Sequence, residues 1–478
     1  MVDFRLSLFL FRRDLRLADN TGLMEAHARS GRVLPCFILD DRQLGPANRY
    51  RGDNAVSFMA RCLIELDGEL RARGGYLHLF AGTAETVLER LLRELPVDAV
   101  FCNRDYTPFS QARDMAMDAI CRKFNRRFLQ FDDALLQPPG SITTGTGSPY
   151  TVYTQFFKRA RVVPVPRPRS TTLSAFHDER IAGERPAGDL AGLAALSNCR
   201  LFRTGGRREA LEILDDPARF TSYEKERDVP ARQATTGLSA HLKFGAVSAR
   251  EVYHAAASAL GYDNALIGEL YWRDFFTQVG FHFPRVFHGA FKEAFGNVRW
   301  NHDEDAFTAW CQGRTGFPIV DAGMRQLRQT GFMHNRARMI TASFLVKDLH
   351  IDWRLGERHF ARHLIDYDPA VNNGNWQWSA STGCDAQPYF RIFNPWRQQR
   401  RFDPECEYIH RWVPELDGVE PEAIHGLERM VRNGVAASRC IPTDYPPPMV
   451  NHALERRVAK ERFATARQRH EQGRKGGG

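Results

Sequence analysis

The stretch Leu6-Ser7-Leu8-Phe9-Leu10-Phe11 is the first of five short apolar runs in the amino-terminal part of the chain. The other four runs are similarly short and lie at Val33–Leu39, Tyr76–Phe80, Ala99–Cys102 and Phe128–Phe131. Longer segments with helical spacing separate them, for example Ala55–Arg73. Strands that alternate with helices predict a parallel sheet wrapped by helices.

No Gly-x-Gly-x-x-Gly motif follows any of the predicted strands. Such a motif holds the pyrophosphate of a dinucleotide at the carboxyl end of a strand. We therefore expect any dinucleotide cofactor to bind outside this sheet.

The rest of the chain changes in character. Residues 132–200 are expected to be an irregular linker, because segments such as Val163-Pro164-Val165-Pro166-Arg167-Pro168-Arg169 favour extended chain. Amphipathic stretches such as Asp305–Cys311 and Asp321–Arg328 predict helices after residue 200. The expected organisation is an α/β, Rossmann-like domain over 1–131, the linker, an all-α domain over 201–450 and a basic tail over 451–478.

The tail holds eight Lys or Arg against three Glu, an excess of five positive charges. It could attract DNA. Its low apolar content instead favours a solvated and partly disordered end without a mechanistic role.

The whole chain has 478 residues and a net charge of +9, which favours polyanionic partners such as nucleic acid without proving one. The nine cysteines form no Cys-x-x-Cys pair, so a reducing compartment and no structural metal are expected. The first apolar run leads directly into Arg12 and Arg13, unlike a secretory signal, and no run approaches the ~18 apolar residues of a membrane span. These features predict a cytoplasmic, monomeric protein that does not bind membranes.

All eight tryptophans lie in the second half of the chain: Trp272, Trp300, Trp310, Trp353, Trp376, Trp378, Trp396 and Trp412. Any one of them could simply fill a helical core, where large aromatic side chains dominate packing. Their segregation as a group indicates a specialised aromatic interior.

The densest polar segment is Asp366-Tyr367-Asp368-Pro369-Ala370-Val371-Asn372-Asn373-Gly374-Asn375-Trp376-Gln377-Trp378-Ser379-Ala380-Ser381-Thr382-Gly383. Carboxylates, amides and a glycine between aromatic residues predict a loop and helix start that grip a polar ligand. The tryptophans there could serve as stacking surfaces or one-electron relays.

Three further segments are weaker signals on their own. Met333–Met339 places Asn335 and Arg338 on adjacent helical turns, and Thr235–Ser239 offers hydroxyls that could cradle a phosphate or simply form a turn. Glu269–Phe276 puts Glu269 on one helical face with Trp272 and Arg273, as a surface ion pair would also do.

Taken together, these four segments resemble the photolyase and cryptochrome family, and specifically its class I cyclobutane pyrimidine dimer photolyases. The resemblance begins at Phe11-Arg12-Arg13-Asp14-Leu15-Arg16-Leu17 and continues through Val152–Phe156. It is strongest from Thr315–Asp321 to Phe390–Pro395. It therefore covers nearly the whole chain.

The resemblance implies that FAD binds inside the helical domain and is active as the fully reduced anion. The cofactor contacts that it implies are Tyr223, Thr235, Thr236, Gly237, Leu238, Ser239, Glu269, Arg273, Asn335, Arg338, Asp366, Tyr367, Asp368 and Asn372. Hydroxyls and backbone donors suit the pyrophosphate, and Arg338 with Asp366 suits the isoalloxazine. Asn372 is expected at the reactive N5 edge.

The substrate implied by the resemblance is UV-damaged DNA whose pyrimidine dimer is flipped out of the duplex. The implied DNA and substrate contacts are Glu269, Trp272, Arg273, Phe276, Asn335, Arg336, Met339, Trp378 and Arg391. Trp272 and Trp378 would flank the dimer, and flipping costs least where damage has weakened stacking. Glu269 would steady the radical stage of repair.

By the same resemblance, excited reduced flavin gives one electron to the dimer, which splits and returns it. Trp376, Trp353 and Trp300 match the family's tryptophan chain, which reduces oxidised flavin from the surface. With Glu269 and Asn372 they complete the residues expected to take part in catalysis.

A blue-light receptor of the cryptochrome type, without repair activity, is the alternative. Plant-type receptors of this family typically carry Asp where Asn372 stands. A carboxylate at position 372 would disfavour an anionic flavin through like charge. The sequence therefore favours dimer repair.

A second, light-harvesting chromophore is also characteristic of the family. Members with a folate antenna, methenyltetrahydrofolate, often show a Cys-Lys pair where this chain reads Val286-Phe287. An 8-hydroxy-5-deazaflavin near Phe37–Asp41, Arg51 and Asn103–Asp105 is preferred, and an empty antenna site is the alternative.

Overall fold

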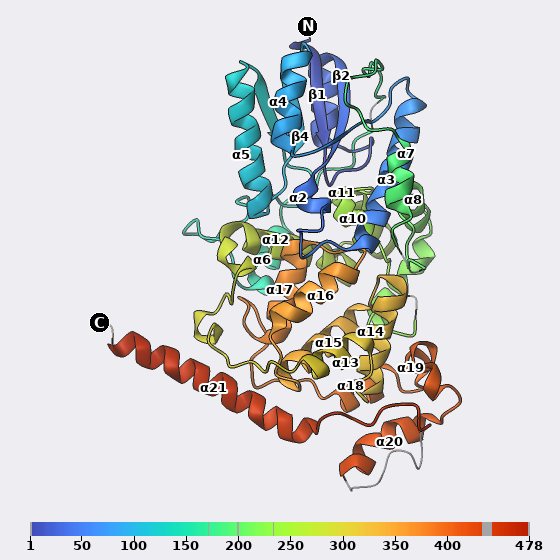
Figure 1. Ribbon diagram of the computed structural model, residues 1–478, viewed down its shortest axis with the longest axis vertical. Helices are drawn as coiled ribbons and strands as arrows, with labels where there is room; N and C mark the ends of the chain where they lie inside the picture. The colour runs from blue at the N-terminus through green and yellow to red at the C-terminus, as the bar shows by residue number, and fades with distance from the viewer. Residues whose placement is uncertain (1, 171, 198–199, 233, 433–441, 477–478) are drawn as a thin grey trace.

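The five apolar runs at the start of the chain all form strands. The computed structural model describes residues 2–170, 172–197, 200–232, 234–432 and 442–476, so Cys199, Cys440 and the last two residues of the basic tail lie outside it. The strands are β1 (Phe4–Phe11), β2 (Ser30–Leu39), β3 (His78–Ala81), β4 (Ala99–Asn103) and β5 (Arg127–Phe131). Every neighbouring pair is parallel, in the order β3-β2-β1-β4-β5, which confirms the predicted sheet. Strands β1, β2 and β4 are labelled at the top of Figure 1.

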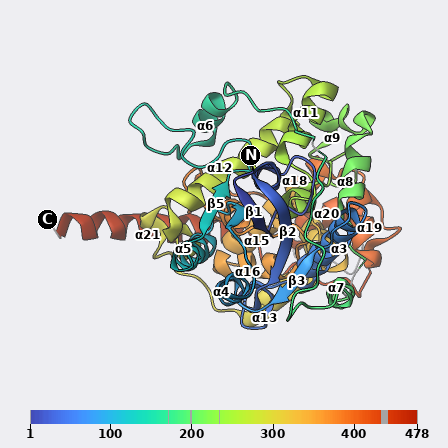
Figure 2. The same ribbon diagram turned by 90° about the horizontal axis from the view of Figure 1, so that it is seen from above.

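Helices cover both faces of this sheet. Phe9 and Phe11 pack with α1 (Thr21–Arg29) and α3 (Asp53–Arg71), whereas Leu8 and Leu10 pack with α4 (Ala84–Glu94) and α5 (Pro108–Lys123). Successive side chains of a strand point to opposite faces, so a strand with apolar side chains on both faces needs both covers. Figure 2 shows the sheet edge-on between these helices. The short helix α2 (Asp41–Leu44) follows β2.

The linker is more regular than predicted. It contains α6 (Tyr153–Ala160) and α7 (Gly188–Ala194), so the expectation of an irregular segment was wrong for these stretches. Phe156 and Ala160 are buried one helical turn apart, and the Phe156 ring lies 5.6 Å from that of Phe275. Leu190 of α7 is buried in the cluster that includes α3. Tertiary contacts supply the apolar burial that short isolated helices lack.

The described residues after position 200 form helices and loops, which confirms the all-α expectation for this half. The α-helices are α8 (Arg207–Leu214), α9 (Tyr223–Glu226), α10 (Ser239–Phe244), α11 (Ala249–Leu260), α12 (Ala265–His282), α13 (Glu304–Gln312), α14 (Pro318–Thr330), α15 (Asn335–Lys347), α16 (Trp353–His363), α17 (Pro369–Ala380), α18 (Pro395–Phe402), α19 (Glu407–Trp412), α20 (Pro421–Arg432) and α21 (His452–Gly476). Short 3-10 helices lie at Pro217–Phe220, Pro284–Phe287, Glu293–Phe295 and Pro414–Leu416.

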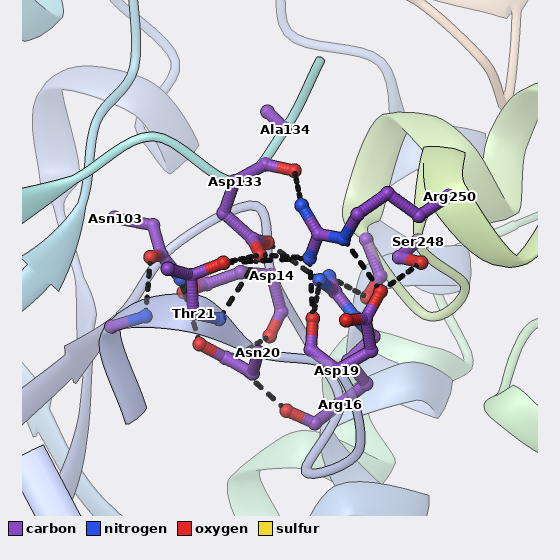
Figure 3. Close-up of polar contacts among 12 residues, drawn as sticks. Asp14, Arg16, Asp19, Asn20, Thr21, Asn103, Asp133, Ala134, Ser248 and Arg250 are labelled. Atoms are coloured by element: carbon purple, nitrogen blue, oxygen red, sulfur yellow. Dashed lines mark hydrogen bonds and ion pairs between the residues drawn. The ribbon is translucent and has the colours of Figure 1, made fainter. Parts of the chain in front are cut away.

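Buried ion pairs join the two halves (Figure 3). Arg250 of α11 lies 2.9 Å from Asp19 and 2.7 Å from Asp133, and Arg16 lies 2.6 Å from Asp133. Burial alone would raise the pKa of Asp133, but Arg16 and Arg250 hold it well below its usual range. Ser248 adds a hydrogen bond to Asp19 at 2.6 Å. Removing one partner of such a network leaves a buried charge uncompensated, so the network holds the halves in one arrangement.

A second buried carboxyl, Asp274 of α12, has fewer partners. One oxygen accepts the N–H of Gln137 at 2.8 Å, and the other is buried without a hydrogen-bond partner. Burial raises the pKa of Asp274 to about 7, although Arg273 opposes the shift. The folded state therefore holds this proton more tightly than the unfolded chain does.

We expect Asp274→Asn to flatten the pH dependence of stability. A carboxyl whose pKa is raised by folding destabilises the fold as pH rises from about 4 through 7, because the unfolded chain ionises first. The loss of unfolding free energy between about pH 5 and 8 should shrink by about 2 kcal/mol in the variant. Denaturant titration of parent and variant at both pH values measures this difference in unfolding free energy. The exposed Asp417→Asn is the control, and an unchanged pH dependence in Asp274→Asn would contradict the assignment.

Candidate functional site

Three helices bring most of the predicted site residues together. Helix α12 carries the 269–276 segment, α15 begins at Asn335, and α17 begins directly after Asp368. Helix α17 packs against both α12 and α15. The fourth segment, at 235–239, joins them through Ser239, whose hydroxyl donates to Asp366 at 2.6 Å.

Asp368 and Pro369 determine where α17 starts. The Asp368 side chain accepts hydrogen bonds from the N–H groups of Ala370 and Val371 at 3.0 and 3.1 Å, and Pro369 occupies the first turn. Asp368 also pairs with Arg13 of the amino-terminal half. Burial alone would raise the pKa of Asp368, but Arg13 and then Arg273 lower it. The Asp368 carboxylate, a predicted cofactor contact, thus already binds the start of α17 and Arg13 of the amino-terminal half.

Asp366 keeps a free acceptor. Its Oδ2 accepts from Arg338 at 2.8 Å and from Ser239, while its Oδ1 is buried without a partner. The carboxylate side chain is 4% exposed. An unpartnered buried carboxylate oxygen is costly, so it marks a position where a ligand donor fits.

The 235–239 segment is a turn. Gly237 has a φ of +65°, which a residue with a side chain rarely adopts, and the N–H of Leu238 donates to the Thr236 hydroxyl at 3.3 Å. Thr235 and Thr236 are half-buried and Ser239 is exposed. Their hydroxyls with Asp366 and Arg338 form a donor and acceptor set that fits FAD, with the hydroxyls suited to phosphate and the ion pair to the flavin ring system.

Glu269 of α12 and Tyr223 of α9 lie close to each other. Glu269 forms an ion pair with Arg227 at 2.7 Å, and its side chain is 41% exposed. Removal of water raises the pKa of Glu269, with Arg227 opposing the shift. Burial and then Glu269 raise the pKa of the Tyr223 phenol. The sequence analysis did not identify Arg227. The only signal for it was its position four residues after the predicted contact Tyr223, which is about one helical turn.

Trp272 is the centre of an aromatic stack. Its ring lies 3.5 Å from that of Tyr153, nearly parallel at 7°, and 5.4 Å from that of Phe276. Phe276 and Trp378 line one cavity, together with Gly374. Both predicted dimer-flanking tryptophans are therefore associated with Phe276, Trp272 through ring stacking and Trp378 through the shared cavity. Tyr153 was not among the predicted site residues, although it lies in the segment Val152–Phe156 that resembles the family.

The predicted phosphate contacts differ in availability. Arg391 is exposed, whereas Arg336 pairs with Asp228 at 2.6 Å and lies over the Phe402 ring at 4.2 Å. The exposed Asn335 amide lies 4.0 Å from the sulfur of Met339. Arg336 is therefore already paired with a protein carboxylate in this structure.

Three predicted cofactor contacts have protein partners. The Asn372 amide donates to the backbone oxygen of Glu357 at 3.2 Å, and the Tyr367 ring is stacked on Tyr50 at 6.2 Å. Arg273 donates to the carbonyl oxygens of Ala134 and Leu242, at 2.6 and 3.2 Å. Arg273 therefore also holds the two halves together.

The three tryptophans of the predicted chain share one core cluster. Trp376 and Trp353 are buried, and Trp300 is partly exposed at its edge. The indole N–H of Trp376 is buried without a partner. A Cβ at Gly356 would lie 2.2 Å from the Trp376 ring, so glycine is required there. Two of the three tryptophans are thus buried, and the third lies at the partly exposed edge of the cluster.

The polar groups of the predicted antenna region are largely occupied. The Asn103 amide donates to Asp14 at 2.6 Å and to Asn20 at 2.8 Å, and Asp105 pairs with Arg13 at 3.2 Å. Arg51 pairs with Asp53, and its Nε is buried without a partner. Arg51 thus keeps an unused donor in this set, and the half-exposed Arg104 lies 3.8 Å from Asp132.

The described part of the chain lacks two other features, a metal-binding cluster and a membrane-spanning helix. Within the described ranges, no three His, Cys, Asp or Glu side chains are grouped so that they could hold a metal ion. None of the described helices is both long and apolar enough to cross a membrane.

Comparisons with known proteins agree with this geometry. A family model described as DNA photolyase matches residues 7–169, and one described as the FAD binding domain of DNA photolyase matches residues 266–465. The deoxyribodipyrimidine photo-lyase of Alkalihalophilus pseudofirmus is 38% identical over 468 residues, covering 95% of this chain and 96% of that protein.

Solved structures show the same relationship. The crystal structure of an archaeal photolyase from Sulfolobus tokodaii with two FAD molecules has 41% identity and a TM-score of 0.86, and the match covers 96% of this chain and 100% of that one. A Synechocystis cryptochrome has 25% identity and a TM-score of 0.84, with 96% and 99% covered.

The sheet domain, the helical half and the matched FAD-binding region define a flavoprotein of two parts. The chain belongs to the DNA photolyase family.

Proposed function

We propose that this chain is a light-driven lyase that splits cyclobutane pyrimidine dimers in DNA, with FAD as its cofactor. The observation that carries the proposal is the aromatic group Trp272, Phe276 and Trp378 on α12 and α17, together with the open oxygen of Asp366, which pairs with Arg338 of α15. Helix α17 packs against both α12 and α15, so it links the stacking surfaces for bases to a flavin-type donor set. Relatives of the same length and 38% identity carry the photo-lyase name.

The cofactor would be held by the hydroxyls of Thr235, Thr236 and Ser239 and by the Arg338–Asp366 pair, with Tyr223 and the 237–238 backbone nearby. Asn372 is a neutral amide in a buried position, so it can face an anionic flavin without like-charge repulsion. Reduced FAD supplies, on excitation, the electron that opens the dimer and then recovers it.

The remaining residues act on DNA and on electron supply. Trp272 and Trp378 stack against the flipped dimer, and Glu269 exchanges Arg227 for hydrogen bonds to the pyrimidines. Arg391 and Arg336 contact flanking phosphates, which gives affinity and orientation without sequence preference. Trp376, Trp353 and Trp300 relay electrons inward from the surface.

An antenna chromophore is part of the proposal. We prefer 8-hydroxy-5-deazaflavin over methenyltetrahydrofolate because Val286-Phe287 offers the latter no polar side chain, whereas Arg51 retains an unused donor. The Sulfolobus tokodaii photolyase was crystallised with two FAD molecules, which supports the proposal of a flavin-like antenna.

The decisive experiment is repair of a thymine dimer in short DNA by the reduced protein, under blue light and in darkness. We expect the dimer to be lost only in the light. Chromatography of the recovered strand measures this loss. Intact dimer under both conditions, with FAD bound and photoreducible, would favour the photoreceptor instead.

A further inference from the structure

Helix α21 is the least expected element of the fold. The sequence favoured a partly disordered tail, but residues 452–476 form one helix that leaves the helical half and extends away from it in both views (Figures 1 and 2). Eight Lys or Arg and three Glu lie within it. Disorder was therefore the wrong expectation, and the excess positive charge is displayed on a rigid element.

Polar contacts anchor the first half of α21. His452 forms a hydrogen bond with the buried Asp348, and Glu455 lies 2.8 Å from His350. Arg462 donates to the Arg299 carbonyl oxygen at 3.0 Å.

An apolar stripe completes the anchor. Ala459, Phe463 and Ala466 are buried, at the spacing of one helical face. The Lys347 ammonium group lies 3.5 Å from the Phe463 ring centre. Among the described residues after Ala466, none in this helix is buried.

A row of cations runs beside this stripe. Arg456, Lys460 and Arg467 are separated by four and seven residues, so they project from nearly the same side of the helix. Among the described residues, no carboxylate lies within ion-pair distance of Arg456 or Lys460, and Arg467 pairs only with Glu471 in its own helix, at 2.8 Å. An exposed pair of this kind is weak and can be exchanged for another anion.

The row faces the loop that carries a predicted DNA contact. The Phe463 ring is stacked on the Tyr389 ring, with ring centres 6.0 Å apart and an angle of 5° between the planes. The pKa of Arg467 is raised mainly by the hydrogen bond between Arg467 and Glu471, and Tyr389 adds to this shift. Tyr389 is two residues before the exposed Arg391, and Phe390 between them is 51% exposed. The surface from Arg391 to the row therefore offers cations and an exposed ring to one partner.

We propose that this side of α21 binds the phosphate backbone of the DNA duplex that flanks the dimer. The inference rests on the proposed function, and it adds a second contact outside the lesion site. Arg456 and Arg467 are about 16 Å apart at 1.5 Å per residue, so the row follows a stretch of duplex rather than a single phosphate. Duplex DNA carries one charge per ~1.7 Å of axis, which makes such a row complementary to it.

The test compares two double variants of the same helix. R456Q/R467Q removes two cations from the row, and R457Q/R469Q removes two exposed cations from other sides of α21. We expect the first variant to reduce the slope of log affinity against log salt by about 1.8, since each lost phosphate contact contributes about 0.9. Binding is measured by fluorescence anisotropy with a dimer-containing duplex that extends beyond the lesion on both sides.

The control variant should retain nearly the parent slope. An unchanged slope in R456Q/R467Q, or equal losses in both variants, would overturn the proposal. Repair of a dimer in an oligonucleotide only a few nucleotides long, too short to reach α21, reports on the proposed function alone. Parent and variant should repair it equally, and failure of the parent there would count against the proposed function without deciding the role of α21.

Discussion

Asp366→Asn is expected to leave the purified protein largely without FAD. The substitution removes the charge that pairs with Arg338 at 2.8 Å and the buried oxygen that has no protein partner. Losing one partner of a buried pair costs about 3–5 kcal/mol, and the 26% exposure of Arg338 reduces this to about 2 kcal/mol. FAD affinity should therefore fall about 30-fold, measured by titrating flavin-free protein with FAD.

A surface pair supplies the control for this result. Asp178 pairs with Arg32 in the amino-terminal half, and both side chains are largely exposed. Asp178→Asn should leave FAD affinity and thermal stability almost unchanged. Unchanged FAD binding by Asp366→Asn, or an equal loss in the control, would rule out Asp366 as a cofactor contact.

Trp376→Phe is expected to block the photoreduction of bound oxidised FAD nearly completely. Phenylalanine fills much of the same space but is far harder to oxidise than indole, so the relay loses its innermost member. Repair by chemically reduced protein should persist. Flash photolysis and anaerobic repair assays measure the two activities separately.

Trp310→Phe is a matched control in the same core. Trp310 is fully buried, its ring lies 6.2 Å from that of Trp376, and its indole N–H donates to the Thr341 carbonyl oxygen at 3.1 Å. This change should lower stability by about 1–3 kcal/mol through lost packing and a lost hydrogen bond, while photoreduction continues. If Trp310→Phe blocked photoreduction as strongly as Trp376→Phe, general damage to the core would explain both results.

The sequence predicted elements whose cause is local. The run from Leu6 to Phe11 became the central strand because every residue in it except Ser7 is apolar, so it needs cover on both faces. Asp368-Pro369 became the start of α17 because both residues favour that position over any other in a helix. The Arg338–Asp366 pair was also expected, although from family resemblance rather than from spacing.

Pairings between distant segments were not predictable in the same way. Arg13 and Asp368 are 355 residues apart along the chain, and no local pattern indicates that they meet. Tyr153 stacks on Trp272 only because α6 packs on α12.

The tail shows most clearly how the two kinds of information differ. By itself, the sequence determined the fold class, the helical character of the second half and the charge of the tail, because these depend on composition and short-range period. Only the tertiary structure decided that the tail is a helix, since Phe463 reaches a pocket with Phe295, Tyr389 and Lys347. Such burial offsets the entropy of ordering a polar segment, and it depends on the path of the entire chain.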